Sequence, residues 1–484
     1  MKKIMIAAAL TALVSLAGCA GTAETGSSEY RADQAESRNM RLVGFSRLQA
    51  RSAYQPVIHK QGNRWIAYIG HHGGKPKMNP LTGVMENNGT SVVDVTDPAS
   101  PKYINHIPGQ KGGTESGGAQ MVRVCNGSDL PSADRKKVYM LRSFGNSAHE
   151  MWDVTNPEKP EIITVIVRGL RDTHKSWWEC DTGMAFLVSG VKGWKSRRMT
   201  QVFDLSNPAK PVHIRDFGVT GQEPASKNAL KDSFYDLHGP ISVGARRNRI
   251  YFGYGTNRDG LLQIVDREKL INGPREPTPE NLLYPQISRI DLGPWNGAHT
   301  AMPVLGYELA QFKHDAKGRV RDFVFIINES LRNECTEEAR QFVQVIDVTN
   351  EAHPLPVSHF DVPEASGKFC SRGGRFGAHS SNENMPPMYD KRLLFVTWFN
   401  AGVRTIDIRD PYNPKELGYY IPAITSETDE RCIKTPEGQR CKRAIQSNNV
   451  EVDDRGYIYV VDRADTGVHI LEVTGAARAA ANFR

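Results

Sequence analysis

Short runs of alternating apolar and polar residues recur along the chain, and each ends at an acidic residue. "SVVDVTDPASP" at 91 is followed by "EMWDVTNPEKP" at 150 and "QVFDLSNPAKP" at 201, and related runs come later. A period of two predicts a half-buried strand, and the Asp/Asn-Pro pair predicts a turn, because proline holds the preceding residue extended. The aligned acids are Asp94, Asp153, Asp204, Asp266, Asp347, Asp407 and Glu472.

A stronger apolar run precedes each of these acids, as in "RWIAYIG", "KVYMLRS" and "RLLFVTW". A weaker strand before that run and a short edge strand after the second proline complete a unit of four antiparallel strands. Repetition of this unit, once for each acid, predicts an all-β fold: a single seven-bladed β-propeller that covers residues 40–484.

The two ends of the repeat region complement each other. The last unit, with "NNVEVDD", "YIYVVD" and "GVHILEV", supplies three strands, whereas "NMRLVGFSRL" supplies an outer strand without a blade of its own. We therefore expect residues 40–47 to pair with residues 467–473, so that the ring closes without an unpaired edge.

The units resemble the LVIVD repeat, which is named for its third strand; "LLQIVD" at 261 and "FVQVID" at 342 come closest to it. The resemblance extends from residue 40 to the end of the chain, and it implies a β-propeller lipoprotein family without implying a particular activity. The units are longer than a minimal blade, which predicts substantial loop insertions.

The N-terminus predicts export. Lys2 and Lys3 precede the apolar run "IMIAAALTALVSL", which is too short for a permanent transmembrane helix and is typical of a signal peptide, here residues 1–18. The run ends in "LAGC", which resembles the lipobox of bacterial lipoproteins and implies cleavage before Cys19 and lipidation of Cys19. Ala20 implies the outer membrane, on its periplasmic or outer side. The alternative is an ordinary signal peptide with an incidental cysteine.

Composition adds limits on the partners. Residues 19–39 are small and polar, which predicts a flexible tether. The chain is 39% hydrophobic and 24% charged, as in soluble globular domains, and carries a net charge of +7 without a basic block. Nucleic acid is therefore excluded as an expected partner. Beyond the lipid anchor, we expect a monomer that meets a small-molecule substrate or an envelope protein.

Six cysteines remain after Cys19, an even number in an exported chain, where thiols oxidise. Two of them bracket the polar loop "CIKTPEGQRC", two fall at similar points of successive repeats, and two remain. No CxxC motif supports a zinc site. The expected disulfides are Cys432–Cys441, Cys125–Cys180 and Cys335–Cys370.

Histidines recur at the start of the first strand of successive units. In a propeller, the first strand of every blade lines the central axis, so equivalent positions should form a ring. These positions are occupied by Tyr54, Gln120, His174, His238, His299, His379 and Asn448. Four histidines on consecutive blades predict a metal site, with copper or iron as the metal. The alternative is a polar tunnel that only holds ordered water.

Other residues are candidates for supporting roles around the ring. The long connections 216–236, 268–297, 360–377 and 420–446, with the loops 71–89 and 329–341, should wall a pocket above the histidines. Tyr54, Gln120, Asn448 and Arg375 are expected to line that pocket. His71 and His72 could add a ligand, although a solvated loop is the simpler expectation. The carboxylates expected to orient the histidines are Glu383, Asp236, Glu179 and Glu451.

The histidine ring favours a metal-dependent oxidoreductase that acts on a small molecule. The ring resembles that of carotenoid oxygenases, which hold iron with four propeller histidines, and that of the selenium-binding/methanethiol oxidase family. The resemblance is limited to the histidine ring, because neither family's motifs match along the chain. Two alternatives remain: a non-catalytic binding or scaffold propeller of the envelope, and a metal-free hydrolase or lyase that uses a histidine and Glu383.

The cysteine assignment makes a direct prediction. In the full chain kept without reductant, none of the six cysteines after Cys19 should react with an alkylating reagent, because each is in a disulfide. Mass spectrometry of the alkylated protein measures this, and two or more alkylated cysteines would reject the three pairs.

Overall fold

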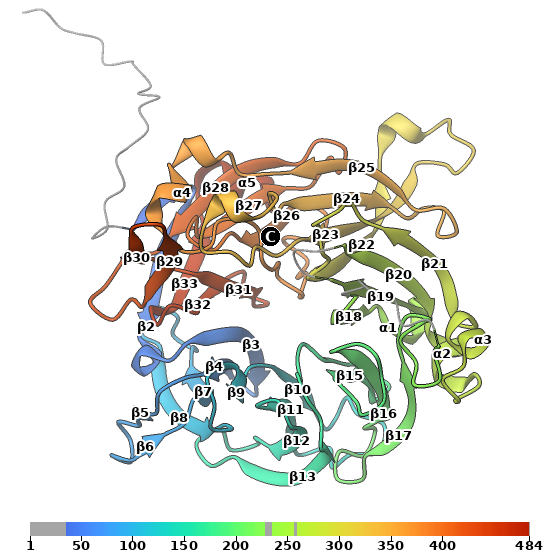
Figure 1. Cartoon of the computed structure of the whole chain (residues 1–484), viewed down its shortest axis with the longest axis horizontal. Coiled ribbons are helices and arrows are strands. Elements are labelled where there is room, and N and C mark those ends of the chain that lie inside the picture. Colours follow the sequence, from blue (N-terminus) through green and yellow to red (C-terminus); the bar gives the residue numbers. More distant parts are fainter. Residues whose placement is uncertain (1–34, 228–234, 256–258, 484) are drawn as a thin grey trace, which may run out of the picture.

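Seven antiparallel sheets stand around one axis, and the chain is a seven-bladed β-propeller, as the repeats predict (Figure 1). The computed structural model describes residues 35–227, 235–255 and 259–483. Helices are few and short. The lipobox, the signal peptide and most of the expected tether lie outside the described residues.

In each of the first five blades the strands follow chain order from the axis outward. They are β3 (Ala53–Gln61), β4 (Arg64–Gly73), β7 (Gly89–Asp94) and β8 (Lys102–Pro108); β10 (Val122–Asn126), β11 (Val138–Phe144), β12 (Ala148–Asp153) and β13 (Glu161–Arg168); β14 (Trp177–Trp178), β15 (Met184–Ser189), β16 (Met199–Asp204) and β17 (Val212–Phe217); β18 (Leu237–Ser242), β19 (Arg249–Tyr254), β20 (Leu261–Asp266) and β21 (Gln286–Asp291); β22 (Thr300–Glu308), β23 (Val320–Ile327), β24 (Val343–Asp347) and β25 (Leu355–Phe360).

Each of the last two blades takes its outermost strand from the N-terminus. They are β26 (Leu393–Thr397), β27 (Val403–Asp407), β28 (Lys415–Ile421) and β1 (Glu36–Arg38); β31 (Ser447–Val452), β32 (Ile458–Asp462), β33 (Gly467–Val473) and β2 (Met40–Ser46).

The remaining elements are short and lie in the connections. They are the strand β9 (Thr114–Ala119) beside β4, the hairpins β5 (Lys77–Met78) with β6 (Met85–Glu86) and β29 (Glu430–Thr435) with β30 (Gly438–Arg443), the helices α1 (Gly244–Arg247), α2 (Arg267–Asn272), α3 (Pro279–Leu283), α4 (Phe369–Arg372) and α5 (Gly475–Ala480), and single 3-10 turns at Leu48–Ala50, Ala310–Phe312, Cys335–Glu337 and Glu364–Ser366. No helix of the described part is long and apolar enough to cross a membrane.

The repeated acids fold the turns that follow the third strands. The Asp94 carboxylate accepts the Thr96 backbone N–H at 2.9 Å, and Asp153 accepts that of Thr155 at 3.0 Å. Asp204, Asp347 and Asp407 bond the backbone two residues ahead in the same way. A carboxylate that accepts a hydrogen bond from the backbone N–H two residues later stabilises the turn. This explains why an acid precedes each turn.

The predicted closure of the ring is confirmed. β2 pairs antiparallel with β33, with Met40 opposite Val473 and Ser46 opposite Val468. The strand β1 was not expected: it pairs with β28 of the preceding blade. The ordered domain therefore begins before residue 40. The last residues of the tether expected over residues 19–39 form this strand instead.

One expected inner strand is irregular. The segment "FGAHSSNEN" makes only an isolated bridge to β26. Asn382 donates its N–H to the Phe395 carbonyl at 3.1 Å, and its side-chain oxygen accepts the Phe395 N–H at 2.9 Å. A side chain that satisfies the neighbouring backbone competes with a regular ladder, so the sixth blade has no regular strand at the axis.

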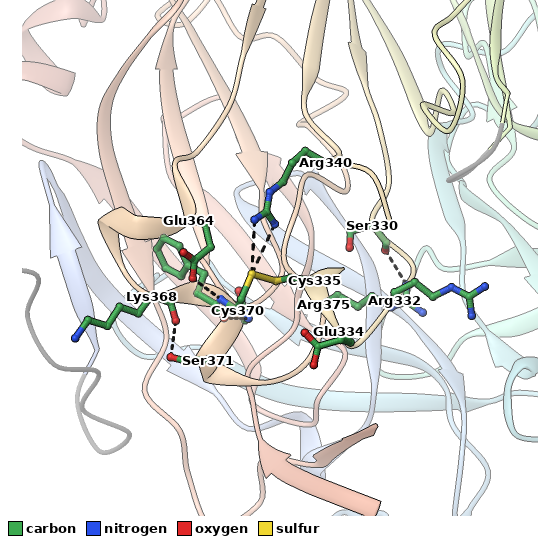
Figure 2. The surroundings of a disulfide bond; sticks show 12 residues. Ser330, Arg332, Glu334, Cys335, Arg340, Glu364, Lys368, Cys370, Ser371 and Arg375 are labelled. Carbon is green, nitrogen blue, oxygen red and sulfur yellow. Dashed lines mark hydrogen bonds between the residues drawn. A yellow bond between two sulfur atoms is a disulfide. The ribbon is translucent and has the colours of Figure 1, made fainter. Parts of the chain in front are cut away.

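All three expected disulfides are present, Cys125–Cys180, Cys335–Cys370 and Cys432–Cys441. Figure 2 shows Cys335–Cys370, with the guanidinium nitrogens of Arg340 3.7 Å from the Cys370 sulfur. This bond joins the connection 360–377 to the loop 329–341, so it holds together two of the loops expected to wall the pocket.

The closing strand should contribute to stability through one buried side chain. Met40 is 3% exposed and packs between the sixth and seventh blades, whereas Leu42 on the same strand is 41% exposed. Met40→Ala should lower the free energy of unfolding by about 2–4 kcal/mol, because it opens a cavity in that seam. Leu42→Ala is the matched control and should cost less than about 1 kcal/mol. Equal losses in chemical unfolding would contradict this role for the closing strand.

Candidate metal centre

The four histidines of the third to sixth blades meet at the axis, and all are buried. Consecutive rings are in contact: the centroids are 4.4 Å apart for His174 and His238, 3.8 Å for His238 and His299, and 4.2 Å for His299 and His379. The predicted ring on consecutive blades is therefore formed.

Backbone hydrogen bonds fix three of these histidines in equivalent places. His174 donates its N–H to the carbonyl of Val188 at 2.9 Å, and His299 donates to Ile327 at 2.9 Å. His379 makes the same bond to Thr397 at 3.0 Å. Each acceptor lies on the strand directly outward from the histidine in the same blade, so the blade itself sets the height of the imidazole along the axis.

Sequence reasoning missed the carboxylate that joins this ring, Glu329. Its Oε2 lies 3.3 Å from His238 Nε2, and its Oε1 lies 3.7 Å from His379 Nε2. Ligand atoms of His238, His299 and Glu329 all lie within 4.8 Å of one another, and all three residues are buried. Glu329 opens the loop 329–341, which was expected above the ring; an acid at the exit of a second strand is the signal that could have identified it.

The spacing around His238 suits one metal ion. Its Nε2 lies 3.3 Å from His174 Nε2 and 3.3 Å from Glu329 Oε2. Two ligand atoms that each lie about 2.0–2.1 Å from a metal in tetrahedral geometry are themselves about 3.3–3.4 Å apart. Each of these two pairs therefore has the spacing of neighbouring ligands on one ion.

The hydrogen bonds leave ring nitrogens available at the centre. His379 donates its Nδ1 proton to the Asn448 carbonyl, which leaves Nε2 as an acceptor facing Glu329. His299 Nδ1 lies 3.0 Å from the Thr300 hydroxyl, and its Nε2 is buried without a hydrogen-bond partner among the described residues. A buried nitrogen of this kind, on a ring oriented through its other nitrogen, fits a metal ligand.

The charge states also fit ligands. Burial lowers the pKa of His174 and of His299 well below the usual range, with help from neighbouring histidines, and lowers that of His379 to about 3. These imidazoles are therefore neutral at pH 7. Burial alone would raise the pKa of Glu329, but its contacts with His238, His379 and Arg375 prevail and lower the pKa to about 2.

Two of the expected supporting carboxylates belong to a different network. Glu383 pairs with Lys175 and Arg123 instead of orienting a histidine. Glu451 accepts the backbone N–H groups of Glu383 and Asn384, at 3.2 and 2.8 Å. The expectation for Glu383 failed because it assumed a regular strand after His379 and could not include a lysine from another blade.

The other two expected carboxylates also have different partners. Glu179 is held by Arg267 at 2.6 Å, between the third and fourth blades. Asp236 accepts the backbone N–H of Arg197 at 2.8 Å and lines the cavity above the ring. In the described part of the chain, Glu329 is thus the carboxylate that contacts the ring histidines.

A second layer lies directly next to the ring along the axis. Lys175 Nζ donates to the hydroxyl of Thr300 at 3.0 Å and of Ser380 at 3.4 Å. Asn449 donates to the same Ser380 hydroxyl at 3.2 Å, and Gln55 donates to Glu383 at 3.1 Å. Except for Glu383, every residue of this layer comes one position after a ring residue in the sequence. The inner strands therefore present the histidines at one level of the axis and the ion pair at the next.

A cavity of about 180 Å³ opens above the histidines. Tyr54 and Arg375 line it, as expected, and the Tyr54 hydroxyl lies 3.1 Å from His174 Nε2. Gln120 and Asn448 are buried but do not line it; Gln120 donates to the Glu115 carbonyl at 3.1 Å.

His71 and His72 are not in a solvated loop. Both lie in β4 and are buried, with His71 Nε2 2.8 Å from the Ser91 hydroxyl and His72 Nε2 3.3 Å from Glu115 Oε1. The strand continues further than its apolar pattern indicates, because β9 pairs with its end.

Comparison with known proteins adds little. No family model matches the chain, and no curated protein matches it. Two solved structures of Sqt1 from Chaetomium thermophilum are similar, at TM-scores of 0.45 and 0.43 and identities of 11% and 12%. Each alignment covers 90% of this chain and 98% or 99% of the other. Similarity at this level says nothing about what this chain binds.

The ion-pair layer should make stability depend on pH. Burial, together with the neighbouring Glu383, raises the pKa of Glu451 to about 8. A carboxyl whose pKa is raised by folding makes its full contribution to stability below its unfolded pKa of about 4.3. That contribution is lost as the pH rises through about 8. Glu451→Gln keeps the neutral form, so its melting temperature should fall less than that of the wild type between pH 5 and pH 9.

Thermal unfolding at several pH values measures this difference. Glu472→Gln is the control, because Glu472 pairs with Arg41 at the rim and should leave the wild-type slope unchanged. Parallel curves for the wild type and Glu451→Gln would show that Glu451 is ionised in the folded protein.

Proposed function

We propose that this protein is a metal-dependent oxidoreductase that acts on a small molecule. The observation that carries the proposal is the close approach of His238, His299 and Glu329, whose ligand atoms lie within 4.8 Å at a buried position below an open cavity. In this proposal His174 and His379 flank the ion and complete its surroundings.

The set of donor groups favours iron over copper. Two neutral imidazoles and one carboxylate are the donor set typical of mononuclear non-haem iron(II), and they would hold such an ion here. When bound, such an ion would supply one-electron and oxygen chemistry to a substrate in the cavity. A site of imidazoles alone would have fitted copper equally well, so Glu329 is the group that supports iron in this proposal.

The protein's own groups prepare this site. Burial keeps the imidazoles neutral, so their nitrogens carry lone pairs at neutral pH. Arg375 lies 3.3 Å from Glu329 Oε1 and favours its ionised form. The Tyr54 hydroxyl, 3.1 Å from His174, is a polar group that can meet a substrate at the cavity floor. Disulfides on the surrounding loops limit their movement.

We also propose that the protein works in the bacterial envelope, anchored to the outer membrane through lipidated Cys19. The "LAGC" motif supports this anchor. Three disulfides support an oxidising compartment, because they are rare in cytosolic proteins.

The test of the proposed function is the metal affinity of Glu329→Gln. This change keeps the shape of the side chain but removes the charged ligand, so the affinity for iron(II) should fall more than about tenfold. The control is Glu337→Gln, an exposed glutamate in the same loop, which should bind iron as the wild type does. Anaerobic calorimetry with iron(II) gives the affinities.

Unchanged affinity in Glu329→Gln would remove Glu329 from the site. If the wild type binds neither iron(II) nor copper, the oxidoreductase proposal fails, and a non-catalytic binding or scaffold propeller takes its place. Melting temperatures of both variants check that the fold survives.

A further inference from the structure

A second, larger cavity adjoins the one above the histidines. It has a volume of about 410 Å³ and lies where the loops of the first and seventh blades meet the hairpin β29–β30. Arg463 lines both cavities. His72 lines the second, and its ring packs edge-on against Tyr54 of the first at a centroid distance of 4.8 Å. A ligand that passes Arg463 could therefore occupy both spaces.

Positive charge exceeds negative charge around this second cavity. Its basic residues are Lys75, Lys77, Arg431 and Arg463, and its acidic residues are Asp429 and Asp465. Two of the ion pairs are long: Lys77 Nζ lies 3.8 Å from Asp465, and Arg431 lies 3.5 Å from Asp429, whereas Arg463 lies 3.2 Å from Glu115. An anion could bind Lys77 and Arg431 without first breaking a tight pair.

The crowding of arginines continues into the first cavity. Arg375 lines this cavity together with Arg463. Arg198 lies on the same cavity wall, where its nearest carboxylate contact is Glu115 at 3.9 Å. The arginines on this wall would attract a bound anion.

The lining of the second cavity is polar and small. Among the described residues that line it, Ala50 is the only alanine or larger apolar residue, and Gly73, Gly74 and Gly113 form part of the wall. A Cβ on Gly113 would meet no other atom within 4 Å, so the absent side chain leaves open space there. A lipid or aromatic ligand would find little apolar surface, whereas a hydrophilic anion would find charged donors.

We propose that the substrate is an elongated molecule with two anionic groups. One group binds in the second cavity near Lys77 and Arg431, Arg463 contacts the middle, and the other end lies above the histidines near Arg375. This inference rests on the proposed function for the reactive end only. Carboxylate and phosphate groups share the required chemistry.

Calorimetric titration of the full chain with simple anions tests the proposal. The probes are unbranched dicarboxylates of four to ten carbons, monocarboxylates of the same lengths, and inorganic pyrophosphate. At one chain length the dicarboxylate should bind about tenfold or more tightly than its monocarboxylate, because a second charged hydrogen-bonded group adds to binding.

The double variant Lys75→Gln/Lys77→Gln should remove that advantage and leave monocarboxylate binding unchanged. Lys102→Gln is the matched control, because Lys102 is exposed on the outermost strand of the same blade. Tighter binding of pyrophosphate than of any dicarboxylate, also lost in the double variant, would support the cavity and identify phosphate as the group. The proposal is overturned if no dicarboxylate exceeds its monocarboxylate and pyrophosphate does not bind, or if the double variant binds as the wild type.

Titrations of metal-depleted and iron-loaded protein separate this inference from the proposed function. A dicarboxylate preference in a protein that binds no metal would refute the metal site and leave the two-cavity groove standing. Normal iron binding without any anion preference would refute the two-cavity groove and leave the metal site standing.

Discussion

Apolar packing between neighbouring sheets holds the blades at fixed angles to one axis, and the histidines converge because of it. Leu394 and Val396 of β26, for example, share one buried cluster with Phe323 and Phe325 of β23. This packing turns one residue per blade toward the same point, although imidazoles without counter-charges have no attraction that would gather them. The site thus depends on the blades, and the blades do not depend on the site.

Two levels along the axis have different roles. At one level, neutral imidazoles and Glu329 form a group with open nitrogens. At the next, Lys175 and Glu383 are buried and paired, and such pairs are costly to break. The ion-pair level connects first strands of different blades, so it helps to hold the histidines in place from the neighbouring level.

The local patterns predicted the fold well, because repeated acids, prolines and strand periods are short-range signals. The seven blades, the closing strand β2 and the three disulfides all follow from them. β1 did not, since "ESR" has no apolar alternation and pairs only because the chain passes the edge of β28. The irregular segment at His379 was also missed, because its polar side chains replace the ladder bonds.

The candidate site was predicted in part. The ring positions follow from the repeat, but Glu329 approaches the histidines from a loop of the fifth blade, and no spacing in the sequence encodes that distance. The four carboxylates expected to orient the histidines have arginine, lysine or backbone partners, most of them from distant positions. Ion-pair partners of this kind depend on tertiary structure and cannot be read from local pattern.

The most direct test of the metal centre is the elemental content of the full chain, purified without chelators from the cells that make it. We expect about one equivalent of iron per chain, because the buried donor set of two imidazoles and a carboxylate is suited to that ion. Less than about a tenth of an equivalent of any transition metal would contradict the metal centre, since a preformed site of this kind should retain its ion through purification.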